Sequence, residues 1–358
     1  MLSDSRVSKQ AKLLVNYCTK IKKGEVVQIS STDLAKPLVI EVYKEVLKKH
    51  PKEVITHIGF DEMQEVFYDV CTEEQLRQFP ALAMEEVKNT DVWIGIISPK
   101  NTRHLSEIHP KKLAFHQQAL KPLLDYRVSN TRWVLTAFPT EGLAQEADMS
   151  MSSFTDFLYS TIVDVDWASL AKRQDFLAKA LEKGSTIRIV GEDTDLSLLI
   201  KGRKVVPDNG EMNMPGGEVF TSVVENSTSG HIHFTYPAIY GGREVTNVKL
   251  WFEKGKVVKA KATKGETFLH HMLDMDSGAR FVGELGLGNN FKINRFVKNI
   301  LFDEKIGGTI HLALGRSYEE TYGKNESALH WDMIKDLRQG GSLYLDDKRI
   351  QKDGKWII

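Results

Sequence analysis

The chain of 358 residues has few cysteines, no net charge and no long apolar run. Its two cysteines, Cys18 and Cys71, lack CxxC spacing and cannot build a disulfide framework, so we expect a reducing compartment and no thiol metal site. No apolar run approaches the roughly 20 residues that span a bilayer. The first residues are polar and lack the apolar core of a signal peptide, which predicts a soluble cytoplasmic protein.

Positive and negative side chains balance over the whole chain. Lysine plus arginine and aspartate plus glutamate each number 48, so the formal net charge is zero. Without a basic surplus, nothing favours binding to nucleic acid or to an anionic membrane. Hydrophobic residues make up 41% of the chain, which at this length is enough for two domains with cores of their own.

The first half of the chain alternates β-rich runs with amphipathic segments. Apolar residues recur at helical spacing over 38–47, for example, and again over 154–181. Short apolar strands that alternate with helices are typical of a buried, mostly parallel sheet. Neither GxGxxG nor GxxxxGK[ST] follows any of the β-rich runs, so a nucleotide site has no local support. The β-rich runs lie at residues 25–30, 53–58, 91–98 and 132–138.

The pattern changes at Gly184. From there to about residue 258, short β-runs are separated by glycine, asparagine and aspartate, which is typical of antiparallel sheets. We therefore predict an N-terminal α/β domain with a mostly parallel sheet over residues 1–183. A C-terminal β-rich α+β domain over residues 184–358 is expected to carry the functional site.

Five polar side chains of the second domain lie in segments that would hold them rigidly. Three carboxylates and two imidazoles form an oxygen and nitrogen ligand set that suits zinc, cobalt or manganese. About three negative ligands, two divalent ions and one hydroxide nearly cancel in charge, so such a pair suits a low-dielectric pocket. This set predicts a two-metal hydrolase. The five residues are Glu218, Glu284, His311, His330 and Asp332.

The two glutamates lie in glycine-rich surroundings. Glu218 follows a Pro-Gly-Gly turn and starts a β-rich run, so the turn can aim its carboxylate at a fixed point. Glu284 lies between glycines, which indicates close backbone packing around it. The alternatives are a surface-turn acid for Glu218 and a flexible loop for Glu284.

The other three residues lie in predicted strands. After a diglycine turn, His311 shares one strand face with Thr309 and Ala313, which leaves room for a ligand; a hydrogen-bonded core histidine is the alternative. His330 and Asp332 are two positions apart and point to the same face of an extended segment, although this tripeptide is a weak signal alone.

Tyr318 and one rival histidine pair complete the set of candidates. Tyr318, seven residues after His311, has a hydroxyl that would donate to a developing oxyanion, whereas the alternative is simple packing. His231 and His233 also share a strand face, but few carboxylates lie near them, so we expect paired histidines without a metal. Neither an HExxH helix nor a GxSxG elbow is present.

Three motifs resemble those of the thermophilic-type metallo-aminopeptidases, the family of aminopeptidases T and S. They are NMPGGEVFT at residues 213–221, GELGLG at 283–288 and DEKIGGTIHLALG at 303–315. The tripeptide at 330–332 and the segment RWVLTAFPT at 132–140 also resemble that family. Ser222 and Val223 depart from the Ala-Pro or Ser-Pro common there, which concerns loop shape rather than metal binding.

The resemblance implies removal of N-terminal amino acids from peptide substrates by a dinuclear metal centre in a homodimer. Glu218, Glu284, His311, His330 and Asp332 would then be the ligands, with Glu284 as the bridge between the metals. Tyr318 would correspond to the family's active-site tyrosine.

The mechanistic hypothesis is that one metal holds the free α-amine while a bridging hydroxide attacks the carbonyl. No general base is identified, because Val219 follows Glu218 and no second carboxylate stands beside it. The alternatives are another two-metal amidohydrolase and a catalytically dead peptide-binding protein.

Overall fold

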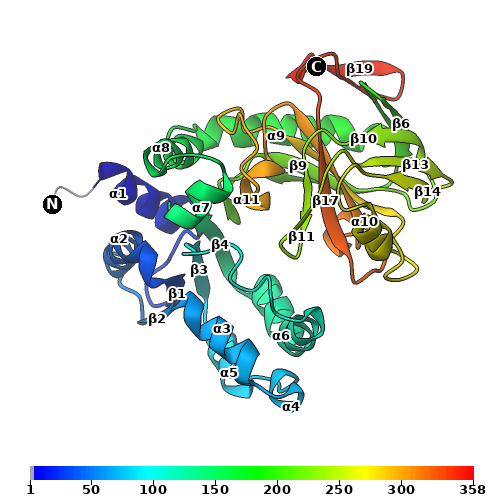
Figure 1. Ribbon diagram of the computed structural model, residues 1–358. Helices are drawn as coiled ribbons and strands as arrows, with labels where there is room; N and C mark the ends of the chain where they lie inside the picture. Colours follow the sequence, from blue (N-terminus) through cyan, green and yellow to red (C-terminus); the bar gives the residue numbers. More distant parts are fainter. Residues whose placement is uncertain (1–3) are drawn as a thin grey trace. The chain divides into compact units, whose positions relative to one another are not determined.

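The computed structural model describes residues 4–358, which form two compact units (Figure 1). The first unit contains the chain up to Asp164 together with Gly210–Pro215, and the second contains Val165–Asn209 and Gly216–Ile358. This division assigns residues 165–183 to the second unit, whereas the sequence-based range 1–183 has them in the first. Of the helices in residues 4–358, none has both the length and the apolar character that crossing a membrane requires.

The first unit contains one five-stranded sheet in which every neighbouring pair is parallel. The predicted α/β architecture with a mostly parallel sheet is therefore confirmed. The central strand β3 (Val92–Ile97) is almost entirely buried, as its apolar sequence requires. In spatial order the other strands are β2 (Glu53–Gly59), β1 (Val26–Thr32), then β4 (Arg132–Ala137) and β8 (Asn213–Met214) on the far side of β3.

Helices connect the strands of the first unit. In α2 (Lys36–Leu47), Leu38, Val39, Val42 and Val46 recur at helical spacing and are buried. Five of the other helices begin at a side chain that accepts from the first turn: Asp4 before α1 (Ser5–Lys12), Thr72 before α4 (Glu73–Leu76), His109 before α6 (Pro110–Asn130), Thr140 before α7 (Glu141–Glu146) and Ser150 before α8 (Met151–Ile162). The remaining helices of this unit are a π-helix (Leu13–Cys18), a 3-10 helix (Asp33–Ala35), α3 (Asp61–Val70) and α5 (Ala81–Lys88).

The second unit is built from antiparallel sheets, as predicted for the C-terminal part of the chain. The larger sheet has eight strands and contains the C-terminal hairpin. Its spatial order is β14 (Lys256–Lys261), β13 (Lys249–Glu253), β10 (Ser229–His233), β6 (Thr194–Leu199), β5 (Thr186–Gly191), β18 (Ser342–Leu345), β19 (Lys348–Lys352) and β20 (Lys355–Trp356).

A five-stranded sheet of the same unit positions the candidate site. In spatial order it contains β17 (His330–Asp336), β16 (Thr309–Gly315), β15 (Val282–Gly288), β9 (Glu218–Ser222) and β7 (Val205–Asp208). The unit also contains the hairpin β11 (Ala238–Tyr240) and β12 (Arg243–Val245), and the helices α9 (Trp167–Glu182), α10 (Glu266–Leu273), α11 (Ile300–Asp303) and a 3-10 turn (Glu319–Thr321).

One face of the five-stranded sheet is apolar and belongs to the core of the second unit. Because side chains alternate along a strand, the residues between these apolar positions all point to the opposite face. Along each strand, core residues therefore alternate with residues of the opposite, polar face. The core residues of these strands are Val205, Val219, Val282, Leu285, Leu287, Ile310, Leu312, Leu314, Trp331 and Met333.

Candidate metal centre

All five predicted ligands lie on the polar face of the five-stranded sheet. The register pairs Gly288 with Glu218, Gly286 with His311 and Ala313 with Asp332. Residues that pair across antiparallel strands point to the same face. The structure thus brings together side chains that are spread over more than a hundred positions of sequence; they come from β9 (Glu218), β15 (Glu284), β16 (His311) and β17 (His330, Asp332).

Glycines make room for these side chains. A Cβ atom on Gly286 would lie 1.9 Å from Cε1 of His311, so the imidazole occupies the space above this glycine. Gly217 has φ +120°, and a Cβ there would lie 2.5 Å from Cβ of Asn290. Only glycine fits such a backbone in so little space. The glycine-rich segment around Glu284 is a fully buried strand and not a flexible loop.

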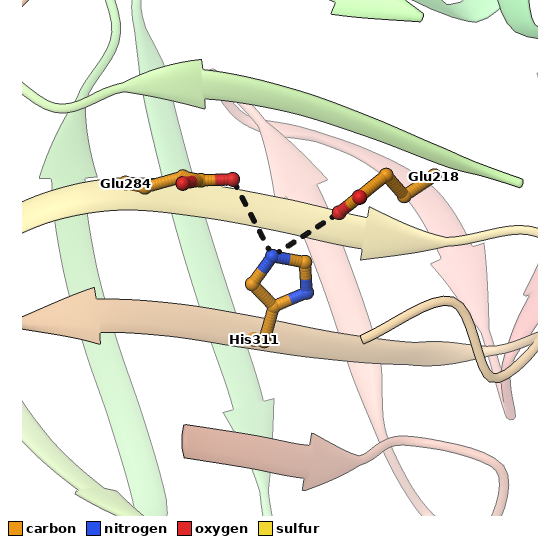
Figure 2. Close-up of side chains that lie close together, drawn as sticks. All are labelled: Glu218, Glu284 and His311. Atoms are coloured by element: carbon orange, nitrogen blue, oxygen red, sulfur yellow. Dashed lines mark ion pairs between the residues drawn. The ribbon is translucent and has the colours of Figure 1, made fainter. Parts of the chain in front are cut away.

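The histidines and glutamates form two groups that share Glu284. In the first group, His311 Nε2 lies 3.2 Å from Glu218 Oε2 and 3.5 Å from Glu284 Oε1 (Figure 2). In the second, His330 Nε2 lies 3.4 Å from Glu284 Oε2 and 3.8 Å from Asp332 Oδ2. The ligand atoms of each group lie within 4.8 Å of one another. The two oxygens of Glu284 therefore face different histidines, as a carboxylate between two metal ions would.

Both imidazoles are held in one tautomer by the backbone. His311 Nδ1 donates to the carbonyl of Glu304 at 3.1 Å, and His330 Nδ1 donates to the carbonyl of Arg316 at 2.8 Å. A carbonyl only accepts, so Nδ1 carries the proton in each ring and Nε2 is presented to the carboxylates. Metal-binding histidines typically show this arrangement.

Two buried atoms of the first group lack hydrogen bonds. Within residues 4–358, neither His311 Nε2 nor Glu218 Oε2 has a hydrogen-bond partner, although they face one another. Such buried polar atoms are costly unless something binds them. The Glu218 backbone is fixed from the other side, because buried Gln174 on α9 donates to its carbonyl at 2.9 Å. A divalent cation fits this donor set.

The electrostatics of the cluster call for positive charge. Burial raises the pKa of Glu218 well above its usual value and also raises that of Glu284. Burial alone would lower the pKa of His311, but the carboxylates of Glu284 and Glu218 raise it to about 10. The pKa of His330 is raised as well, because Asp332 and Glu284 outweigh its burial. Either bound protons or divalent cations can neutralise the negative charge of these carboxylates.

Glu304 and Lys305 are parts of the site that the sequence reasoning missed. Glu304 forms a third group of possible ligands with His311 and Asp332. Lys305 is 0% exposed; its Nζ contacts the Glu304 carboxylate and lies 3.2 Å from Glu218 Oε1 and 3.8 Å from Asp208 Oδ2. The available signal was an acid and a base just before the diglycine turn that leads to His311.

Tyr318 also reaches this cluster. Its hydroxyl lies 3.3 Å from His330 Nε2, and its ring meets that of Phe220 edge to face. Burial raises the pKa of Tyr318 well above 10.0, so the phenol keeps its proton and can donate it in a hydrogen bond. His231 and His233 lie on β10 of the eight-stranded sheet, and neither belongs to a group of possible metal ligands in residues 4–358.

The chain matches a known protein family over nearly its whole length. The family model described as thermophilic metalloprotease (M29) matches residues 3–356. Aminopeptidase AmpS of Bacillus subtilis (strain 168) is 27% identical to this chain, over 99% of this chain and 98% of that protein.

Two solved structures share the fold. Wild-type AmpT from Thermus thermophilus superposes with a TM-score of 0.87 at 21% identity, covering 99% of each chain. The 2,5-dihydroxypyridine dioxygenase from Pseudomonas putida KT2440 gives 0.66 at 13% identity, covering 100% of this chain and 98% of that one. Proteins named for different reactions thus share one fold, so the side chains on the sheet must decide the chemistry.

Proposed function

The chain belongs to the thermophilic metalloprotease (M29) family, and we propose that it is an aminopeptidase that works with two divalent metal ions. Family membership makes it a metal-dependent hydrolase of peptides. The relative named aminopeptidase AmpS, matched over nearly its whole length, supports the removal of residues from the N-terminus. The single observation that favours two ions over one is the position of Glu284 between His311 and His330.

In this proposal Glu218, Glu284 and His311 hold one ion, while Glu284, His330 and Asp332 hold the other. A site of oxygen and nitrogen donors without sulfur suits zinc, cobalt or manganese. When bound, such ions polarise a scissile carbonyl and lower the pKa of a water nucleophile.

The remaining roles belong to side chains of the chain itself. The two backbone carbonyls that fix the histidine tautomers keep Nε2 of each ring directed into the site. Tyr318 donates a hydrogen bond to the oxyanion that develops when the peptide carbonyl is attacked. Glu304 belongs to neither of these two ligand sets. It lies close enough to His311 and Asp332 to accept a proton during the reaction or to bind a metal ion.

The test is hydrolysis of aminoacyl arylamides by metal-stripped protein to which zinc, cobalt or manganese is added singly. We expect activity to return with metal and to disappear when the substrate is N-acetylated, because a blocked amine no longer binds as a free N-terminus. Glu253→Gln, an exposed acid at the end of β13, is the matched control and should behave like the wild type.

Other outcomes would favour the rival functions. Turnover of acetylated substrates would indicate a different two-metal amidohydrolase. Binding of about two metals per chain with peptide binding but no products would indicate a binding protein on this scaffold. Failure to bind metal would overturn the proposal.

We also propose that the protein is a homodimer in the cytoplasm. The dimer rests on the family resemblance, and light scattering of the metal-loaded protein tests it by giving twice the mass of the chain. The cytoplasmic location is supported by Cys18 and Cys71, which are not joined in a disulfide.

A further inference from the structure

The loop of residues 317–325 carries Tyr318 and is closed on itself by short-range hydrogen bonds. The Ser317 amide donates to the Asn325 carbonyl at 3.0 Å, and the Asn325 amide donates to Ser317 Oγ at 2.9 Å. The Tyr318 carbonyl accepts from the amides of Thr321 and Gly323, at 3.2 and 3.0 Å, and from Thr321 Oγ1 at 2.8 Å. These bonds define the shape of the loop but do not fix its place against the sheet.

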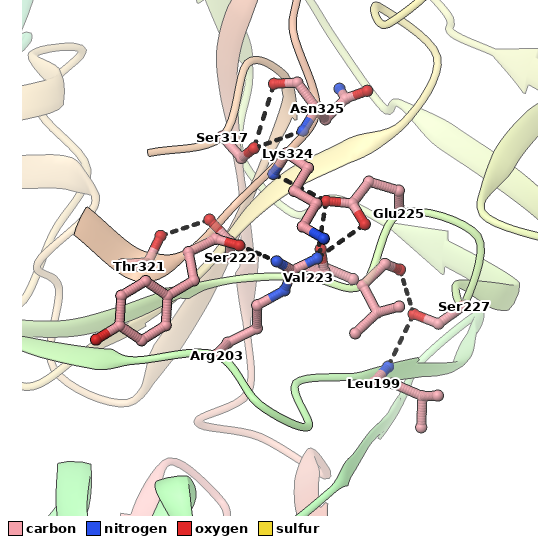
Figure 3. A network of polar contacts seen from close by, with 12 residues as sticks. Leu199, Arg203, Ser222, Val223, Glu225, Ser227, Ser317, Thr321, Lys324 and Asn325 are labelled. Carbon is pink, nitrogen blue, oxygen red and sulfur yellow. Dashed lines mark hydrogen bonds and ion pairs between the residues drawn. The ribbon is translucent and has the colours of Figure 1, made fainter. Parts of the chain in front are cut away.

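Arg203, in the turn after β6, supplies a tether to the rest of the unit (Figure 3). Its side chain is only 7% exposed. One end of the guanidinium donates to the carbonyl of Tyr322, and Nη2 donates to both carboxylate oxygens of Glu225 at 2.8 Å. Glu225 Oε1 also accepts from the Lys324 amide at 2.9 Å. Glu225 is 29% exposed, so only the arginine of this ion pair is buried, and the pair holds the loop at two places, Tyr322 and Lys324.

A second contact joins the loop to β9, the strand that carries Glu218. Ser222 is the last residue of β9, and its hydroxyl bonds to the hydroxyl of Thr321. Gly323 lies so close that a Cβ there would be 2.4 Å from Ser222 Oγ. The tyrosine loop therefore rests on the end of the strand whose beginning presents a proposed metal ligand.

We propose that Arg203 and Glu225 are positioning residues that hold Tyr318 at the distance its hydrogen bond to the oxyanion requires; this rests on the proposed function. An oxyanion donor works only when it is placed in advance, and a displacement of about 1 Å can cost about 100-fold in rate. A partly buried ion pair such as this one is weak support for stability as such, because the loss of hydration offsets the attraction of the charges. The Arg203–Glu225 pair instead fixes the position of the loop that carries Tyr318.

The experiment compares Arg203→Lys, Tyr318→Phe and the double variant for kcat, KM and bound metal. Lysine keeps the charge but lacks the fork that reaches Tyr322 and Glu225 together. We expect Arg203→Lys to lower kcat about 10- to 100-fold with KM and metal content unchanged. In the Tyr318→Phe background it should add little, because the hydroxyl that it positions is gone. Full multiplication of the two effects would overturn the proposal.

Arg338→Lys is the matched control. Arg338 makes a comparable fork to Asp336 in the same unit and touches no residue of the tyrosine loop, so kcat should stay at the wild-type value. Equal losses in both arginine variants would indicate a general structural effect and overturn the positioning role.

Hydrogen exchange gives a reading that needs no turnover. In Arg203→Lys, exchange should rise in peptides that cover residues 317–325 and stay unchanged over residues 282–288. Unchanged exchange in the loop would overturn the tether. Absence of wild-type turnover with every metal would overturn the proposed function instead, so the two failures are distinguishable.

Discussion

Gly286 has no side chain, and the imidazole of His311 from the neighbouring strand fills the space above it. A methyl group at Gly286 would overlap the ring, so Gly286→Ala should displace His311 and weaken metal binding. We expect a loss of stability of about 1–3 kcal/mol from overpacking and a loss of most activity. Metal content by mass spectrometry and the melting temperature check this. Gly59→Ala, at a position with open space, is the control; normal metal content in Gly286→Ala would contradict the argument.

Glu284→Gln should affect both proposed metal sites, because its two oxygens face different histidines. We expect loss of metal and of nearly all activity. Asp332→Asn, in contrast, should weaken only the site formed with His330. Metal stoichiometry measured at increasing metal concentrations separates the two patterns. A Glu284→Gln protein that retains both metals and full turnover would remove Glu284 from the site.

The stability of the metal-free protein should fall as the pH rises from 6.5 toward 10. Burial alone would lower the pKa of His311, but the carboxylates of Glu284 and Glu218 outweigh burial and raise this pKa from 6.5 to about 10. Between these two pH values the folded chain therefore binds more protons than the unfolded chain. The stability that the protonated His311 contributes is complete below pH 6.5 and is lost as the pH rises through about 10. Metal must displace this proton, so the metal-induced rise in melting temperature should grow from pH 6 to pH 9. A rise that is independent of pH would contradict the assignment.

Lys305→Met should destabilise the second unit strongly. Its buried ammonium faces the carboxylates of Glu304, Glu218 and Asp208, and removing it leaves several buried negative charges together. Breaking a buried ion pair costs about 3–5 kcal/mol, which denaturant unfolding of the metal-free protein would reveal. Lys172→Met on the exposed face of α9 is the control. A loss below 1 kcal/mol would show that Lys305 does not balance these charges.

Strand periodicity explains how much of the site the sequence could predict. His311 in a strand after a diglycine turn, and the two-residue spacing of His330 and Asp332, place these side chains on one face by simple alternation, and the structure shows them there. The glycines around Glu284 indicated close packing correctly, although not that an imidazole fills the space above Gly286. That these residues bind metal stays a prediction.

The parts that were missed depend on contacts between distant segments. Lys305 meets Asp208 and Glu218 only because β7 and β9 pair and α11 ends beside them, and no local pattern encodes that register. Arg203 is likewise an ordinary polar residue in its own turn. Local patterns also could not predict which residues belong to each unit, because the short strand β8 pairs with β4 of the first sheet although the two are far apart in sequence.

Glu304→Gln tests the carboxylate that the sequence reasoning passed over. Glu304 lies with His311 and Asp332 and is held by Lys305, so it is placed to accept a proton during the reaction or to bind a metal. Glutamine keeps the shape of the side chain but removes the charge, and we expect turnover to fall at least about 100-fold, as for loss of a general base. Metal content then separates the two roles, because a proton acceptor leaves both ions in place whereas a ligand does not. Glu319→Gln, an exposed acid on the tyrosine loop, is the control. Turnover at the wild-type rate in Glu304→Gln would exclude both roles and leave Glu304 as a partner of Lys305 alone.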